Sequence, residues 1–279
     1  MQQDNGLVQL LKWYVDSGVD EALGHDPLDR VAPKPAPPAP DLESAKAGMN
    51  AGPDRGGPAE LVSREETARS ARAAAATASS LTELRDALAA FEGCALKKTA
   101  KNLVFADGNP EGPLMIIGEA PGGEEDRQGV PFIGPAGKLL DLMLDSIGLG
   151  RDQAYVTNIL PWRPPGNRSP TDAEIAACHP FVNRHIELVA PKILILVGGT
   201  AAKTILNKTQ GITRLRGHWY TYESPHMNTP IDTRAILHPA YLLRSPAQKR
   251  ETWLDLLEIK HRLSSMADAR QLTNATRRP

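Results

Sequence analysis

The sequence has few cysteines, no long hydrophobic run and no excess of charge of one sign, and each absence excludes a class of protein. Its two cysteines, Cys94 and Cys178, provide no disulfide framework of the kind found in secreted domains. Apolar runs such as 193–197 are far shorter than the roughly 20 residues of a membrane helix. The first residues also lack the basic start and apolar stretch of a signal peptide. We therefore expect a soluble protein of a reducing cytoplasm, with no membrane partner.

The balance of charge also limits the kinds of partner. The chain has 32 Lys+Arg and 33 Asp+Glu residues, for a formal net charge of -1. This excludes a histone-like or tail-driven nucleic-acid binder, but it leaves room for a protein with its positive charge on one face. Partner class must therefore be inferred from motifs.

Four segments are predicted along the 279 residues. Residues 1–30 hold an amphipathic helix, since apolar residues recur there at helical spacing. Its apolar stripe requires a partner, which is either the main domain or another protein. Residues 31–60 contain seven Pro, seven Ala and four Gly and are predicted to be a flexible linker. Residues 61–265 form the main domain, and residues 266–279 a polar C-terminal tail.

From about residue 95 onward, short apolar runs alternate with longer helical patterns, which is typical of a layered α/β domain with a largely parallel sheet. The predicted strands are 114–117, 155–157, 193–197 and 234–237. The predicted helices are 64–78, 81–91, 136–147, 172–189, 200–206 and 247–264. Two of these helices begin with a capping box, in which a serine or threonine precedes a glutamate by three residues.

Polar groups follow the predicted strands at their carboxyl ends, where sites form in open α/β sheets. The first strand is followed by Glu119, the second by Asn158 and the fourth by His238. Each residue alone has an ordinary structural explanation as a loop, turn or hydrogen-bonding residue. Their placement at one edge favours a shared site instead. An amide can read a base edge, an imidazole can stabilise an oxyanion and a carboxylate can activate water, which suits excision of an extruded nucleobase.

Several ordered motifs resemble the uracil-DNA glycosylase superfamily, specifically its family 4. They are GEAPGGEEDRQGVPFIG at 118–134, the strand ending at Asn158, RPPGNR at 163–168 and HPAYLLRSP at 238–246. The resemblance extends from about Phe91 to about Ile259. It implies a three-layer α/β/α fold with a central four-stranded parallel sheet. It also implies a monofunctional enzyme of base excision repair that flips uracil out of DNA and hydrolyses its N-glycosidic bond.

The resemblance also assigns roles to residues. Glu119 would position or activate water and His238 would hydrogen-bond the uracil O2, while Glu125 is a second acidic candidate. The pocket would be lined by Gly118 and Ala120, with Phe132 stacking on uracil and Asn158 reading its Watson–Crick edge. The implied DNA-binding residues are Arg163, Arg168, Leu242, Leu243 and Arg244, with an apolar side chain of the last segment filling the gap left by the flipped nucleotide.

In one respect the sequence departs from this family, whose members normally hold a 4Fe-4S cluster with four cysteines. Cys94 and Cys178 match the second and fourth ligands, whereas Phe91 and Trp162 occupy the first and third positions. Because two thiolates do not supply the usual ligand set, we expect no cluster and no other metal. Phe91 and Trp162 are predicted to fill its volume with apolar bulk.

Two other functions are compatible with the sequence. One is a glycosylase for other deaminated or damaged bases, and the other is a non-catalytic DNA-binding repair adaptor. Asn158 favours uracil, because its carboxamide can pair with O4 and N3–H, and the retention of Glu119 and His238 argues against an adaptor. The expected partner is uracil-containing DNA, with a protein partner for the N-terminal helix as a further candidate. The enzyme is expected to be a nucleoid-associated monomer.

Overall fold

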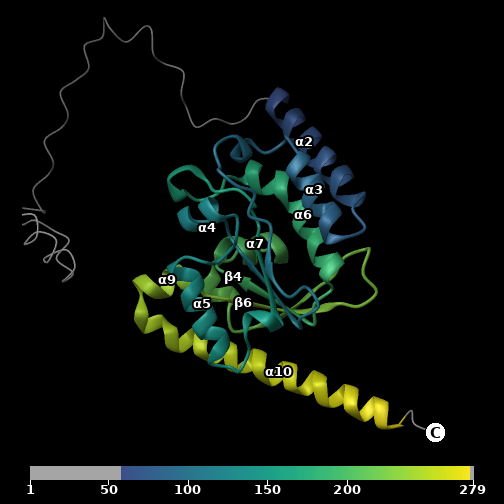
Figure 1. The fold of residues 1–279 in the computed structure, drawn as a ribbon, viewed down its shortest axis with the longest axis vertical. Coiled ribbons are helices and arrows are strands. Elements are labelled where there is room, and N and C mark those ends of the chain that lie inside the picture. The colour runs from purple at the N-terminus through teal and green to yellow at the C-terminus, as the bar shows by residue number, and fades with distance from the viewer. Residues whose placement is uncertain (1–57, 277–279) are drawn as a thin grey trace, which may run out of the picture. The chain divides into compact units, whose positions relative to one another are not determined.

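The computed structural model describes residues 58–276 of the chain (Figure 1). The predicted helix in residues 1–30 and most of the 31–60 linker lie outside the described residues. The helices are α2 (Pro58–Ala76), α3 (Leu81–Ala90), α4 (Gly123–Gln128), α5 (Pro135–Asp145), α6 (Asp172–Val189), α7 (Gly199–Leu206), α8 (Ile212–Leu215), α9 (Pro239–Arg244) and α10 (Lys249–Thr276). The strands are β1 (Asp107–Gly108), β2 (Leu114–Gly118), β3 (Ala154–Asn158), β4 (Ile193–Val197), β5 (Trp219–Tyr222) and β6 (Ile231–Ile236). Short 3-10 helices are η2 (Ala95–Lys98), η3 (Arg151–Gln153), η4 (Pro165–Asn167) and η5 (Pro246–Gln248).

These strands form one six-stranded sheet in the order β1-β3-β2-β4-β6-β5. The four central strands are parallel, which confirms the predicted α/β fold, and each corresponds to a predicted strand. The two edge strands, β1 and β5, are antiparallel to their neighbours and were not predicted. β1 has only two residues and lies in a sequence rich in turn-forming residues, so it carries no strand pattern.

Helices cover both faces of the sheet, as predicted for three layers (Figure 1). Alternate residues of β2 point to opposite sides, so Met115 and Ile117 join a core with α2, α3, α6 and α7, whereas Leu114 and Ile116 join a core with α5, α9 and α10. All four side chains are fully buried. Burial of each contributes about 1.5–3 kcal/mol relative to exposure, and a strand buried on both faces is typical of parallel sheets.

The predicted helix starts are largely confirmed. The side chains of Ser80 and Thr171 accept hydrogen bonds from the backbone N–H of Glu83 and Glu174, so α3 and α6 begin where their capping boxes indicate. α10, by contrast, continues past residue 265 to Thr276, into the segment predicted to be a polar tail. Similarly, α2 begins at Pro58, inside the predicted linker.

A buried ion-pair network holds the end of the sheet against α10. Asp255 of α10 accepts hydrogen bonds from Arg234 of β6 at 2.8 Å and from Arg216 at 2.9–3.0 Å. Since Asp255 is fully buried and Arg234 is 4% exposed, removal of one partner would leave an uncompensated buried charge. This network fixes β6, the strand that leads directly into His238.

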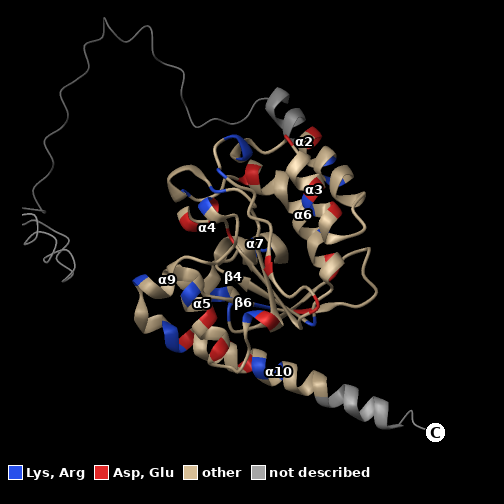
Figure 2. Ribbon diagram, viewed as in Figure 1, with Lys and Arg blue, Asp and Glu red and all other residues tan. Residues whose placement is uncertain are grey.

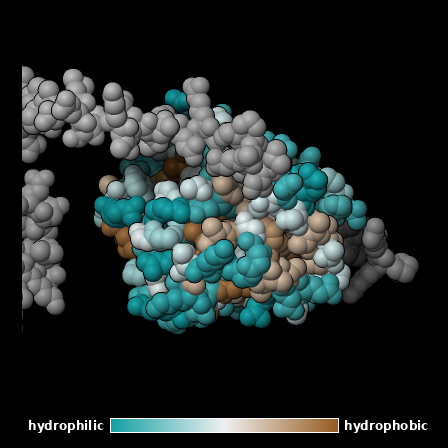
Figure 3. Space-filling model, turned by 90° about the horizontal axis from the view of Figure 1, so that it is seen from above, coloured by the Kyte–Doolittle hydropathy of each residue, from teal (hydrophilic) through white to brown (hydrophobic). Residues whose placement is uncertain are grey.

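The surface of the described chain is mixed in character. Basic and acidic segments are interspersed along the ribbon, with basic segments where α9 meets α10 (Figure 2). The face in Figure 3 is mostly hydrophilic with scattered hydrophobic areas. Among the described residues, no helix is both long and apolar enough to cross a bilayer.

Candidate active site

A cavity of about 510 Å³ lies at the carboxyl edge of the parallel strands. Loops after β2, β3, β4 and β6 converge on it, as expected for an open α/β sheet. Its lining includes Glu119, Ala120, Glu125, Phe132, Asn158, Arg168, Gly198, Gly199, His238, Ala240, Tyr241 and Arg244. Most of the residues predicted for the site are therefore brought together, although they come from segments far apart in the sequence.

The Phe132 ring forms one wall and is held in an unusual backbone conformation. Its φ of 54° is left-handed, which is rare for an aromatic residue. Arg151 donates a hydrogen bond to the Phe132 carbonyl at 2.6 Å. Gly137 is required beneath it, because a Cβ at that position would lie 1.8 Å from the same carbonyl oxygen. The ring lies 5.9 Å from the His238 ring, centroid to centroid, with 28° between their planes.

Asn158 ends β3 opposite Gly118, its register partner in β2. A Cβ on Gly118 would lie 2.4 Å from Asn158 Oδ1 and 2.5 Å from the Phe132 ring, so only glycine allows the amide and the ring to approach here. Asn158 is 5% exposed, and its side chain makes no hydrogen bond with the described residues. Its donor and its acceptor are therefore both available to a ligand.

His238 caps α9, and this cap defines which ring nitrogen carries the proton. Nδ1 accepts a hydrogen bond from the backbone N–H of Ala240 at 3.1 Å. Burial, together with the charge of Arg244, lowers the pKa of His238 to about 4. At neutral pH the ring is thus uncharged with its proton on Nε2, where it can donate a hydrogen bond.

The two acidic residues differ in their contacts. Glu119 lines the cavity, and one of its carboxylate oxygens accepts a hydrogen bond from the Thr200 hydroxyl. Glu125 instead accepts hydrogen bonds from the backbone N–H groups of Ile133 at 3.1 Å and Gly134 at 2.9 Å. Its carboxylate therefore holds the loop that carries Phe132, a contact that favours a structural role over a second catalytic acid.

The three predicted arginines lie in different surroundings. Arg168 makes a bidentate ion pair with Glu174, at 2.6 and 2.9 Å, and Arg163 donates to Asn167 at 2.7 Å. Arg244 lines the cavity and makes no hydrogen bond or ion pair with any described residue. Of the three, Arg244 has the guanidinium most available to a phosphate.

The structure corrects the prediction for Leu242. Its side chain is 1% exposed and belongs to the core formed with α5 and α10, so it cannot enter DNA. The adjacent Leu243 is 44% exposed on α9. In a helix, consecutive side chains point in directions about 100° apart, so one faces the core and the other solvent.

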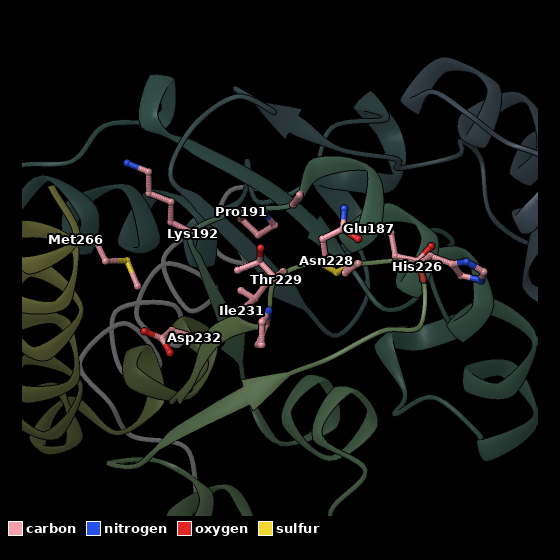
Figure 4. A pocket seen from close by; sticks show the side chains of 12 residues that line it. Glu187, Pro191, Lys192, His226, Asn228, Thr229, Ile231, Asp232 and Met266 are labelled. Carbon is pink, nitrogen blue, oxygen red and sulfur yellow. The ribbon is translucent and has the colours of Figure 1, made fainter. Parts of the chain in front are cut away.

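A second cavity, of about 690 Å³, lies at the opposite, amino-terminal edge of β4 and β6 (Figure 4). It contains none of the residues predicted for the site. Two of its carboxylates are already paired, Glu187 with Arg184 and Asp232 with Arg262. The 221–232 segment, unexplained by the sequence, forms part of this cavity and connects β5 to β6 as a hairpin. That hairpin is therefore remote from the candidate active site.

Two residues that contribute to the candidate active site were not predicted. Thr200 contacts Glu119, and Gly198 has a left-handed φ of 94°, with its Cβ position 3.2 Å from the His238 side chain. The signal for both was the Gly-Gly-Thr sequence after the third predicted strand. That turn carries no side chain with obvious catalytic chemistry, so neither residue was selected as a candidate.

Known proteins similar to this chain share one family. A model of the uracil DNA glycosylase superfamily matches residues 105–257. A type-4 uracil-DNA glycosylase of Archaeoglobus fulgidus is 39% identical over 170 residues, which cover 60% of this chain and 84% of that protein. One from Sulfurisphaera tokodaii is 36% identical over 186 residues, covering 65% and 84%, and one from Thermotoga maritima is 37% identical over 153 residues, covering 54% and 77%.

These relatives correct the prediction that no cluster is bound, because type-4 uracil-DNA glycosylases are a family whose members typically bind a 4Fe-4S cluster. The prediction rested on Phe91 and Trp162 at two of the four ligand positions, which leaves only two thiols. Cys94 and Cys178 are free and buried, in the same core cluster as Phe91 and Trp162.

The described side chains nevertheless do not supply a full ligand set for such a cluster. They include two thiols where a 4Fe-4S cluster takes four. No group of three or more His, Cys, Asp or Glu in the described part of the chain is placed to hold a metal ion.

The superfamily model spans the whole candidate site, from the loop after β2 to the start of α10. The relatives are aligned over most of their own length, at 36–39% identity. On this evidence, the chain belongs to the uracil-DNA glycosylase superfamily and is similar to its type-4 members.

Proposed function

We propose that this protein is a monofunctional uracil-DNA glycosylase of base excision repair, in which the cavity at the carboxyl edge receives an extruded uracil. The observation that carries the proposal is the meeting of Glu119, Phe132, Asn158 and His238 around one cavity. An aromatic wall, an unpaired amide and a neutral imidazole are the groups that a flat pyrimidine requires. The relatives carry the same activity in their names.

Recognition of the base is assigned to Phe132 and Asn158. The Phe132 ring stacks on uracil, and the Asn158 carboxamide accepts a hydrogen bond from N3–H and donates one to O4. Cytosine offers the opposite pattern at these two atoms, an acceptor and a donor. A fixed amide would then leave buried polar groups unpaired against cytosine, which discriminates strongly between the two bases.

Hydrolysis is assigned to His238 and Glu119. As the bond between C1′ and uracil N1 breaks, its electron pair moves to the base, and His238 Nε2–H donates a hydrogen bond to the negatively charged O2. The sugar becomes oxocarbenium-like, and a water held at Glu119 adds to C1′ and loses its proton to the carboxylate. The uracil anion then takes up a proton from solvent and Glu119 releases the proton it received, so the products are neutral uracil and an abasic site.

DNA contact is assigned to α9 and the loop after β3. Arg244 binds a phosphate, and Arg163 and Arg168 orient the 163–168 loop. Leu243 enters the duplex where the nucleotide has left, offsetting the lost stacking of a few kcal/mol. Because one chain builds the whole cavity, we also propose that the enzyme acts as a monomer, and light scattering with and without DNA would test this oligomeric state. Its proposed substrate is DNA of the cytoplasmic nucleoid.

The activity is tested by incubating the protein with a uracil-containing oligonucleotide and then with alkali, which cleaves abasic sites. Strand cleavage that depends on uracil supports the glycosylase. Binding without cleavage supports the adaptor, and cleavage of oligonucleotides with other damaged bases in preference to uracil supports the alternative enzyme.

The two adjacent leucines provide a test of the insertion. Leu243→Ala is expected to slow excision from double-stranded DNA roughly 10-fold, since a few kcal/mol of unstacking are no longer offset, and to change excision from single-stranded DNA little. Leu242→Ala is the matched variant and is expected to lower the free energy of unfolding by about 2–5 kcal/mol, because it creates a core cavity. The measurements are single-turnover rates on both substrates and urea unfolding. Equal losses on single- and double-stranded DNA in Leu243→Ala would contradict the insertion.

A further inference from the structure

The hydroxyl of Thr200 makes the one hydrogen bond described for the Glu119 carboxylate. Thr200 Oγ1 donates to Glu119 Oε2 at 2.5 Å, across 81 positions of the sequence. Thr200 lies in the first turn of α7, directly after the Gly198–Gly199 turn that follows β4. It thus links the loop after β2 to the loop after the neighbouring strand β4.

This contact affects only one of the two carboxylate oxygens. Oε1 makes no hydrogen bond with any described group, while Glu119 itself lines the cavity. An ionised carboxylate is a pure acceptor, so the Thr200 hydroxyl is the donor here and its position sets the orientation of the carboxylate.

Thr200 is not itself a lining residue of the cavity. Its contact with the cavity lining is its hydrogen bond to Glu119. Any effect of Thr200 on the reaction would act through the carboxylate, and binding of the DNA should depend little on it.

We propose that Thr200 is a positioning residue for the reaction. Its hydroxyl fixes the Glu119 carboxylate and directs Oε1 toward the nucleophilic water. This inference rests on the proposed role of Glu119 in holding that water. It adds a hydrogen-bonded pair, made by segments far apart in the sequence, to the hydrolytic machinery.

The test compares Thr200→Val, which removes the donor and keeps the shape, with Thr200→Ser, which keeps the donor. Thr200→Val is expected to slow single-turnover excision roughly 10-fold, the typical weight of a hydrogen bond to a charged group. Its dissociation constant for uracil-DNA should stay within about twofold of the parent value. Thr200→Ser should restore the rate.

Thr204→Val is the matched control, since it makes the same change one turn later on α7, where no hydrogen bond to Glu119 exists. It should leave both the excision rate and the dissociation constant for uracil-DNA unchanged. Glu119→Gln distinguishes the proposed role of Glu119 from the inference about Thr200. If Glu119→Gln excises uracil at the parental rate, the proposed role of Glu119 fails. If Glu119→Gln is slow but Thr200→Val is as fast as the parent protein, only the Thr200 inference fails.

The double variant excludes a purely structural effect. If the threonine acts through the carboxylate, adding Thr200→Val to Glu119→Gln should cause no comparable further loss. A full additional loss in that background, or a slow Thr200→Val whose rate Thr200→Ser does not restore, would overturn the inference.

Discussion

Asn158→Ala is expected to lower the rate of uracil excision at least about 100-fold, because removal of one preorganised group that stabilises a developing charge typically costs this much. The amide has no hydrogen bond to described residues and faces the cavity from the end of β3. Alanine would remove both hydrogen bonds to the base while leaving the backbone pairing of β3 with β2 intact. Single-turnover excision from a uracil-containing oligonucleotide measures the loss.

Asn228→Ala is the matched control for this change. Asn228 is exposed and lines the second cavity at the opposite edge of the sheet. It should excise uracil at the parental rate. If Asn158→Ala were also close to the parental rate, the base-reading role of this amide would be wrong.

His238→Ala is expected to cause a loss of similar size, at least about 100-fold, since the Nε2–H donor to the uracil anion disappears. His226→Ala, at an exposed position of the second cavity, provides the control. The α9 helix also loses the acceptor for the Ala240 N–H, so thermal unfolding should accompany the kinetics. A stable variant with normal turnover would contradict the assignment.

The pH dependence tests the charge state of the same residue. Because the pKa of His238 is lowered to about 4, the ring is neutral throughout the range in which an ordinary histidine titrates. The ratio of parental to His238→Ala rates should thus stay constant from about pH 6 to pH 8. Below this range, protonation of His238 Nδ1 places an N–H donor opposite the Ala240 N–H. The contribution of His238 to the excision rate should therefore fall as the pH approaches 4. A ratio that changes sharply near pH 6.5 would show that the ring titrates normally.

Much of the fold could be predicted from the sequence because the central strands carry strong patterns. Ile193–Val197 is a continuous apolar run, and Asp172–Val189 begins with a capping box and was predicted with the same bounds. The edge strand Trp219–Tyr222 was missed because its side chains are mostly half-buried or exposed, which leaves no apolar alternation. Short helices such as α4 were missed for a similar reason, since six residues cannot show a helical period.

The role of a site residue could be predicted when its residue type alone indicates that role. Prediction was poorer when the role depends on which groups the side chain contacts in the fold. Asn158 and His238 end strands, and the topology brings them together. The contacts of Glu125 with backbone N–H groups depend on how its loop folds back, which no local pattern encodes. Likewise, Leu242 and Leu243 are identical in type, and only packing on α5 and α10 distinguishes them.

The strained backbone at Phe132 has a consequence for selectivity. Its carbonyl is held by Arg151, and the next two N–H groups are held by Glu125, so neither contact needs a bound base. The conformational entropy of this loop is lost when the chain folds and not when the nucleotide enters. An incoming base therefore meets a Phe132 ring that is already in place, and selection among bases does not depend on ordering this loop.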